Sequence, residues 1–232
     1  MYILGISCFY HDSAACLIKD GILLFAAEEE RFTRKKHDHS FPENAVRFCL
    51  DEAKIDISQI DYIAFYEKPL LKFERILHQH IEMFPKSLLT FCLALPSWIN
   101  EKLRLKKIIK KKLRYKKSVL YIPHHLSHAA SSFFVSPFKK AALASIDGFG
   151  DFLSTMTGIG EGSKIKVLDR VEFPHSLGIF YTAITQFLGF WKYGDEYKVM
   201  GLSAFGKPTD LEKLRKIIRL KQNGLFEIDT SY

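Results

Sequence analysis

Apolar and polar residues alternate along the first 30 residues in the manner of β-strands. Three such runs follow one another, YILGIS, SAACLIKD and ILLFAAEEE, and Asp20-Gly21 between the last two can supply the left-handed turn of a tight hairpin. The sequence therefore predicts three strands joined by two hairpins. Residues 43–53 place apolar side chains at helical spacing directly after Pro42, which predicts a helix, and residues 61–67 indicate a further strand.

Residues 70–117 are predicted to be helical throughout, with breaks near Pro85 and Pro96. The remaining predicted elements in the middle and C-terminal parts are a strand at 118–122 and helices at 123–134, 176–188 and 209–220. For the last of these helices, Thr209 followed three residues later by Glu212 predicts a capping box at the start.

The opening pattern of strand, turn, strand, turn, strand occurs twice, at residues 2–29 and again at 141–173. Both copies carry polar residues or glycines at the first turn, FYHDS at 9–13 and DGFGD at 147–151. This repetition predicts two related lobes or half-domains that face a shared cleft, in which the first turn of each approaches a phosphate through backbone N–H groups.

The formal charge of +8 comes from 34 basic and 26 acidic residues, and it is localised. Residues 101–117 hold ten basic residues and one acid, which leaves 24 basic and 25 acidic residues elsewhere, so the rest of the chain is nearly neutral. A solvated helical face explains such a segment, as does binding to nucleic acid or to anionic lipid beside the apolar residues 87–99. We expect no nucleic-acid partner, because charge is the only sign of one.

The chain shows no sequence sign of secretion or of a membrane span. The N-terminus opens directly into a strand pattern, without the basic region and cleavage site of a signal peptide. The apolar stretch 87–99 contains Pro96 and is shorter than the roughly 20 residues that cross a bilayer. The four cysteines form no C-x-x-C pair, which favours reduced thiols over a zinc or redox site. We therefore expect a cytoplasmic location.

The segment PHHLSHAAS at 123–131 carries the clearest local signal for chemistry. His124 and His128 are four residues apart, so on a helix both imidazoles share one face and can chelate one divalent metal ion. The alternative is a histidine cluster that only caps the helix and forms hydrogen bonds. His125 points elsewhere on the helix and is expected either to support the metal ligands from outside or to be structural.

A second candidate is SIDGFGD at 145–151, in which Asp147 is expected to end an apolar strand. A carboxylate released there into the glycines Gly148 and Gly150 can ligate a metal ion or approach a phosphate-bound cation. The alternative is an ordinary hairpin turn with Asp as its first residue.

A third candidate combines the turn at 9–13 with the basic loop at 31–38. The turn offers His11 and Asp12, and the loop offers the four cations Arg31, Arg34, Lys35 and Lys36. These side chains would gather around an anionic ligand, because the hairpin between the two segments returns the chain to the same end of the sheet. A solvated basic loop is the alternative.

Taken together, these strings resemble the ATP-dependent O-carbamoyltransferases of nodulation-factor, cephamycin and aminoglycoside biosynthesis. The matching stretches are GISCFYHDSAACLIKDGILLFAAEEERFTRKKHD, FPENAVRFCL, HHLSHAASSFF, SIDGFGD, FPHSLGIFYTAITQFLGF and GDEYKVMGLSAFG, in the family's order over residues 4 to 206. The resemblance implies an α/β fold of the actin and sugar-kinase ATPases, ribonuclease-H-like, whose first lobe has a mixed sheet and here a helical insertion at about 70–117. It also implies transfer of a carbamoyl group from carbamoyl adenylate, made from carbamoyl phosphate and ATP, to a hydroxyl of a small molecule or sugar.

The resemblance also assigns roles to particular residues. His124 and Asp147 match metal-ligand positions, His128 completes the H-x-x-x-H pair, and the metal implied is iron. His11 and Lys36 match residues that contact carbamoyl adenylate. A metal ion and Lys36 would stabilise charge on the carbamoyl oxygen and phosphate, while His11 would accept the proton of the acceptor.

The chain is shorter than the family. The expectation is that residues 1–232 are the N-terminal part of the carbamoyltransferase domain, and that the second lobe with a further metal-ligand Asp and the C-terminal adenylate-forming domain are absent. Such a chain would be a fragment, a split subunit or a truncated remnant. The alternative function is therefore a non-catalytic nucleotide-binding remnant or a subunit that needs a separate partner chain, and a homodimer also stays open.

Overall fold

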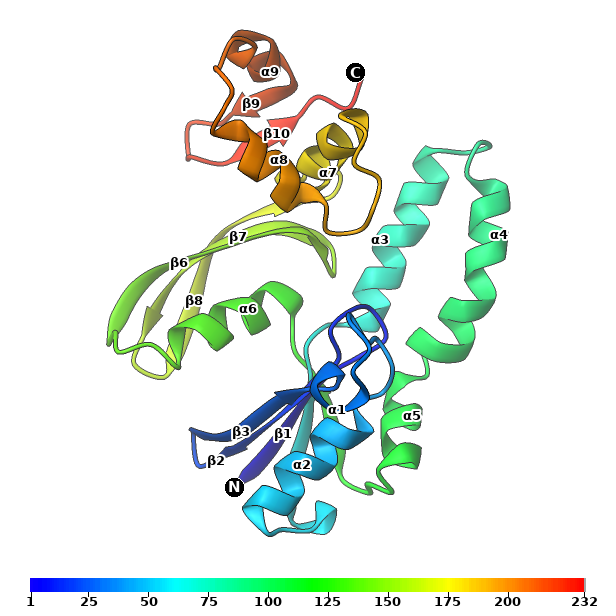
Figure 1. Ribbon diagram of the computed structural model, residues 1–232, viewed down its shortest axis with the longest axis vertical. Helices are drawn as coiled ribbons and strands as arrows, with labels where there is room; N and C mark the ends of the chain where they lie inside the picture. The colour runs from blue at the N-terminus through cyan, green and yellow to red at the C-terminus, as the bar shows by residue number, and fades with distance from the viewer. Residues whose placement is uncertain (232) are drawn as a thin grey trace. The chain divides into compact units, whose positions relative to one another are not determined.

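The computed structural model describes residues 1–231 and leaves out only Tyr232. The chain divides into two units, Met1–His124 and His125–Tyr232. Unit 1 is built on a five-stranded sheet with the order β3-β2-β1-β4-β5, and Figure 1 labels its strands β1, β2 and β3 next to helix α2. The strands are β1 (Tyr2–Ser7), β2 (Ala14–Lys19), β3 (Ile22–Glu28), β4 (Tyr62–Phe65) and β5 (Ser118–Tyr121). β1 pairs antiparallel with β2 and parallel with β4, and β4 pairs parallel with β5. This is the mixed sheet of the ribonuclease-H-like fold, so the predicted fold class is confirmed.

The tight hairpin between β2 and β3 follows from local chemistry. Lys19 pairs with Ile22, and the two residues between them both have positive φ, 51° at Asp20 and 86° at Gly21. Two left-handed residues give the turn twist that matches two antiparallel strands. The predicted hairpin is confirmed.

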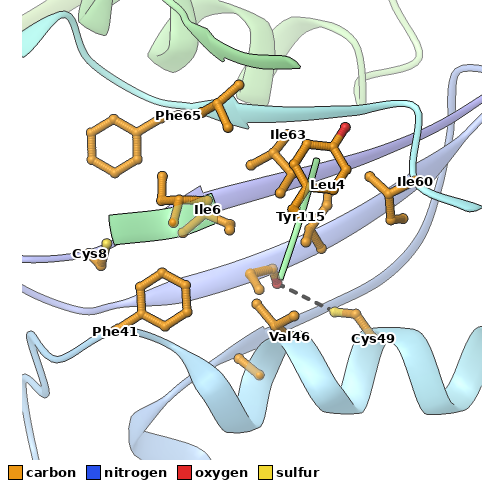
Figure 2. Packing of buried hydrophobic residues seen from close by; sticks show 14 of the residues in the cluster. Leu4, Ile6, Cys8, Phe41, Val46, Cys49, Ile60, Ile63, Phe65 and Tyr115 are labelled. Atoms are coloured by element: carbon orange, nitrogen blue, oxygen red, sulfur yellow. Dashed lines mark hydrogen bonds between the residues drawn. The ribbon is translucent and has the colours of Figure 1, made fainter. Parts of the chain in front are cut away.

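Helix α2 (Glu43–Ala53) covers one face of this sheet, and its bounds match the predicted helix. Val46 and Cys49 face the strands from α2, while Leu4, Ile6 and Ile63 face it from the sheet (Figure 2). The Cys49 thiol also donates a hydrogen bond to the backbone carbonyl of Ala15 at 3.7 Å. Burial of the Val, Leu and Ile side chains, each contributing about 1.5–3 kcal/mol, holds α2 against β2 and β3.

The start of α2 is held by a residue from another element. Pro42 occupies the N-cap position and makes no side-chain cap, but the buried carboxylate of Glu29 lies in its place. Glu29 accepts hydrogen bonds from Asn44 N at 3.2 Å, from Asn44 Nδ2 at 2.7 Å and from Ala45 N at 2.8 Å. A carboxylate there satisfies otherwise unpaired amides and matches the positive end of the helix dipole.

Between β4 and β5 the chain forms helices α3 (Pro69–Glu82), α4 (Leu88–Ser97) and α5 (Leu105–Lys112), with the π-helical turn η2 (Trp98–Lys102) before α5. The predicted break near Pro85 is confirmed, because α3 ends at Glu82 and α4 begins at Leu88, but the prediction of helix as far as residue 117 is wrong beyond α5. Arg114 has a φ of 51°, a left-handed conformation that ends the helical path before β5. Pro96 lies inside the last turn of α4, and the α-helix ends one residue later. Shorter elements of this unit are α1 (Glu30–Thr33) and the 3-10 helix η1 (Ile57–Gln59).

Unit 2 has an antiparallel sheet of β6 (Lys140–Gly150), β7 (Leu153–Glu161) and β8 (Lys164–Glu172), which confirms the repeated pattern of three strands. The other elements are α6 (His124–Phe133), whose first residue closes unit 1, α7 (Leu177–Phe187), α8 (Glu196–Ser203), α9 (Leu211–Ile217), β9 (Ile218–Leu220) and β10 (Phe226–Ile228). The predicted capping box is wrong, because α9 begins after Asp210 and the Thr209 hydroxyl donates to the Asp210 carboxylate instead. Helix α8, which contains Gly201, was not predicted. No described helix is long and apolar enough to cross a membrane.

Candidate functional site

Helix α6 carries the H-x-x-x-H pair and is fixed to the sheet of unit 2 by His125. Its buried ring lies with Nε2 3.1 Å from the Leu153 carbonyl oxygen and with Nδ1 2.8 Å from Ser145 Oγ. A carbonyl oxygen only accepts, so Nε2 carries a proton, and in the neutral ring Nδ1 then accepts from the Ser145 hydroxyl. His125 therefore has a structural role, one of the two that the sequence left open, and it sets the rotation of α6 about its axis.

With α6 fixed in this way, His128 and Asp147 come close together. His128 Nε2 lies 3.4 Å from Asp147 Oδ2, and one ligand atom each from His124, His128 and Asp147 lie within 4.8 Å of one another. Two imidazole nitrogens and one carboxylate oxygen form a donor set that suits divalent iron and similar transition metals. The three side chains therefore fit a metal ion by their chemistry and their spacing.

Asp147 does not end a strand, which corrects the expectation from the sequence. β6 continues to Gly150, and its pairing with β7 is irregular between Ile146 and Gly150. A bulge of this kind re-aims side chains locally without ending the strand. The Asp147 side chain is steadied there by a hydrogen bond from Gly148 N to Oδ1 at 2.6 Å.

The start of helix α7 contacts the backbone of the same bulge. The Ser176 hydroxyl caps α7 by accepting from Ile179 N at 3.1 Å, and it donates to the Gly148 carbonyl oxygen at 2.5 Å. A Cβ on Gly178 would lie 2.7 Å from Gly148 N and 2.8 Å from the Asp147 carbonyl carbon, closer than real Cβ atoms come to backbone. Residues 176–178 are thus tied to the backbone of Asp147, a link that no sequence spacing revealed.

The two glycines expected to approach a phosphate both lie in β6. The Gly148 amide donates to Asp147, and Gly150 pairs with Leu153 across a turn in which Asp151 has a φ of 54°. Contact of Gly148 or Gly150 with a phosphate stays a prediction.

In unit 1 the turn at 9–13 and the loop that follows α1 run side by side. Phe9 N donates to His39 O at 2.8 Å, and Ser13 N donates to Asp38 O at 2.8 Å. Lys36 is exposed two residues before Asp38. His11 and the loop of Lys36 therefore belong to the same end of the sheet.

Asp12 joins the two segments through their histidines, which the sequence did not reveal. Its carboxylate lies 2.8 Å from His11 Nδ1 and 2.9 Å from His37 Nδ1. The hydrogen bond with His37 lowers the pKa of Asp12, and the bond with His11 adds to the effect. His37 N also donates to Glu30 Oε2 at 3.0 Å, and ligand atoms of Asp12, Glu30 and His37 lie within 4.8 Å of one another. An ionised Asp12 can thus hold His11 in one orientation.

Asp38 anchors the base of the same loop. The carboxylate accepts from Ser40 N at 2.9 Å and from the Thr33 hydroxyl at 2.9 Å, and the residue is buried. The hydrogen bond from the Ser40 amide, more than the others, lowers the pKa of Asp38 to about 2. Ionised Asp38 therefore keeps the segment after Lys36 against the turn that carries His11.

The chain is similar to several known proteins. The chain is 44% identical over its whole length to the uncharacterized protein sll1178 of Synechocystis sp., of which it covers 39%. It is 34% identical over 95% of its length to the nodulation protein NolNO of Sinorhizobium fredii, of which it covers 32%. Among solved structures, YeaZ from Pseudomonas aeruginosa is similar at 16% identity and a TM-score of 0.37, over 75% of this chain and 66% of that one.

The chain thus spans well under half the length of these two relatives. Residues 2–232 match the family described as carbamoyltransferase N-terminus. That match includes the turn at 9–13, the H-x-x-x-H pair and Asp147. By this match and these identities, the chain belongs to the N-terminal region of the carbamoyltransferase family.

Proposed function

We propose that this chain carries the carbamoyl-transfer site of an O-carbamoyltransferase, which moves a carbamoyl group from carbamoyl adenylate to a hydroxyl of a small molecule or sugar. The observation that supports it most is the meeting of residues 9–13 with the loop of Lys36, because it brings a titratable imidazole and a cation to one end of the sheet. The relatives are longer, so formation of the adenylate from ATP and carbamoyl phosphate is assigned to the rest of the full-length protein.

In this proposal the acceptor oxygen attacks the carbamoyl carbon, a new C–O bond forms, and the bond from that carbon to the phosphate oxygen breaks. AMP leaves with the electron pair of the broken bond, and the acceptor proton passes to His11. Asp12 holds Nδ1 of His11, so the proton is taken at Nε2. Lys36 lies in reach of the same ligand and offsets the negative charge of the phosphate and carbamoyl oxygens.

His124, His128 and Asp147 are proposed to hold a divalent metal, most simply iron, which would act as a Lewis acid toward bound oxygen atoms. This chain contributes the fixed ligand geometry. His125 sets the helix, and residues 176–178 set the backbone of Asp147.

The proposal is tested with the full-length protein, carbamoyl phosphate, ATP and a panel of sugar and amino-sugar acceptors, by measuring acceptor-dependent release of AMP. His11→Asn should lower turnover by about 10²–10⁴-fold, the usual contribution of a general base. Lys36→Ala should weaken binding of the adenylate by about 10–100-fold, because a charge-assisted contact contributes about 1.5–3 kcal/mol. Lys35→Ala, an exposed neighbour, is the matched control. Wild-type behaviour of both site variants would refute the assignment, and absence of any turnover would favour the non-catalytic alternative.

Metal binding has its own test, which does not depend on turnover. Elemental analysis of the purified full-length protein should find close to one divalent metal ion per chain, and His124→Ala should remove most of it. His39→Ala, which changes an exposed histidine outside the cluster, should leave the metal content unchanged. Equal metal in the His124→Ala variant and the parent would show that these three residues do not hold it.

A further inference from the structure

Helix α4 has no polar face. Its sequence is LLTFCLALPS, without a charged residue. Its covered side faces α3, where Phe91 lies 5.0 Å from the His80 ring and Trp98, just after α4, lies 6.0 Å from Phe73. A helix that is apolar all round is normally enclosed by protein or lipid.

The other side of α4 is exposed over its apolar residues. Leu89 and Leu93, one turn apart, are 72% and 74% exposed, and Leu88 and Cys92 beside them are also exposed. We call these four residues the α4 face. Apolar exposure continues into the connection from α3 to α4, where Phe84 is 66% exposed. Apolar residues that are exposed singly are common on protein surfaces, whereas a contiguous apolar surface of this kind marks an interaction site.

The charge around the α4 face is strongly positive. Residues 83–117 contain eleven basic residues, Lys86 and the ten in 101–117, against the single acid Glu101, a formal +10. On α5, Leu105 and Ile109 are buried while Lys107, Lys110 and Lys111 are exposed. None of these three lysines forms an ion pair within the described part of the chain. The arm formed by residues 83–117, which includes α4 and α5, thus combines apolar and cationic residues with a single acid in its sequence.

We propose that this arm attaches the protein to an anionic lipid surface. Apolar side chains of the α4 face would enter the interface between headgroups and acyl chains, and lysines of α5 would meet the anionic headgroups. A second copy of the chain fits less well, because two such arms would bring like charges together. The helix lies in the plane of the interface in this proposal, which agrees with the finding that no described helix is long and apolar enough to cross a bilayer.

Flotation of the full-length protein with vesicles tests the proposal. The protein should float with vesicles of phosphatidylcholine mixed with phosphatidylglycerol and should stay behind with phosphatidylcholine alone. The double variant L89E/L93E should lose flotation, whereas Ile22→Glu, which changes an exposed apolar residue of β3, should not. The triple variant K107Q/K110Q/K111Q should bind about a hundredfold more weakly and with less dependence on salt.

A triple control in unit 2, K139Q/K164Q/K166Q, removes the same charge from exposed positions elsewhere and should float normally. Thermal melting of each variant separates lost binding from lost folding. The proposal is overturned if the full-length protein does not float, if it floats equally with both kinds of vesicle, or if folded L89E/L93E floats like the parent. It is also overturned if L89E/L93E instead dissociates a dimer, since the α4 face would then bind a second copy.

Discussion

Replacement of Glu29 by alanine should lower the free energy of unfolding of unit 1 by about 2–4 kcal/mol. The carboxylate accepts three hydrogen bonds at the start of α2, two from Asn44 and one from Ala45. Loss of a cap at the partly buried Asn44 costs about 0.5–2 kcal/mol. The buried amide of Ala45, left without an acceptor, costs about 1–3 kcal/mol. Local sequence at Pro42 offers no replacement acceptor.

Urea unfolding followed by tryptophan fluorescence measures this loss. The chain has two tryptophans, Trp98 in unit 1 and Trp191 in unit 2, so a Trp191→Phe background leaves a reporter in unit 1 alone. A loss of about 2–4 kcal/mol with a slope of about 2 kcal/mol/M lowers the urea midpoint by about 1–2 M. Glu28→Ala, which removes an exposed carboxylate paired with Arg31, should change the stability by under about 0.5 kcal/mol. If Glu29→Ala and Glu28→Ala unfold at the same midpoint, Glu29 does not hold α2.

Three further outcomes are expected. Gly178→Ala should weaken metal affinity by about 10–100-fold in a titration, because its Cβ meets backbone, whereas Gly201→Ala, in open space, should match the parent. Asp38 has its pKa lowered to about 2 against about 3.9 when unfolded, so its stabilisation is complete above about pH 4 and is lost as the pH falls through about 2. As the pH is lowered from about 4 to about 2, the urea midpoint of Asp38→Asn should therefore fall less than that of the parent. An equal fall in both proteins would contradict this role of Asp38. Exposed Cys92 should react with Ellman's reagent at once. Cys8, whose pKa is raised to about 12 by burial, should react only when the protein unfolds. A fast phase of the reaction that survives Cys92→Ser would contradict this.

The elements that the sequence predicted well depend on neighbouring residues. The turn at Asp20-Gly21 needs only two residues that tolerate positive φ, and the bounds of helix 43–53 follow from its own apolar spacing after Pro42. The spacing of His124 and His128 likewise fixed their common helix face before any tertiary contact was known. A local pattern can also mislead, because Thr209 and Glu212 fit a capping box although α9 begins after Asp210.

The features that the sequence did not reveal depend on contacts between distant segments. Asp12 meets His37 across 25 positions, and Glu29 caps a helix whose first bonded amide is 15 positions away. The bulge at Asp147 reflects contact with Ser176, 29 positions along the chain. No periodicity records such pairings, because each requires the fold to be known first.

The close contact between α7 and β6 has a thermodynamic consequence. The first turn of α7 bears on the Asp147 backbone, and the last residue of this 11-residue helix, Phe187, is exposed. A ligand that moves the exposed end would shift a carboxylate of the proposed metal site, and linkage requires that metal binding at that site change the affinity for the ligand by the same factor. This hypothesis of mutual coupling fails if a ligand bound at Phe187 has the same affinity for the metal-loaded protein and for the His124→Ala variant.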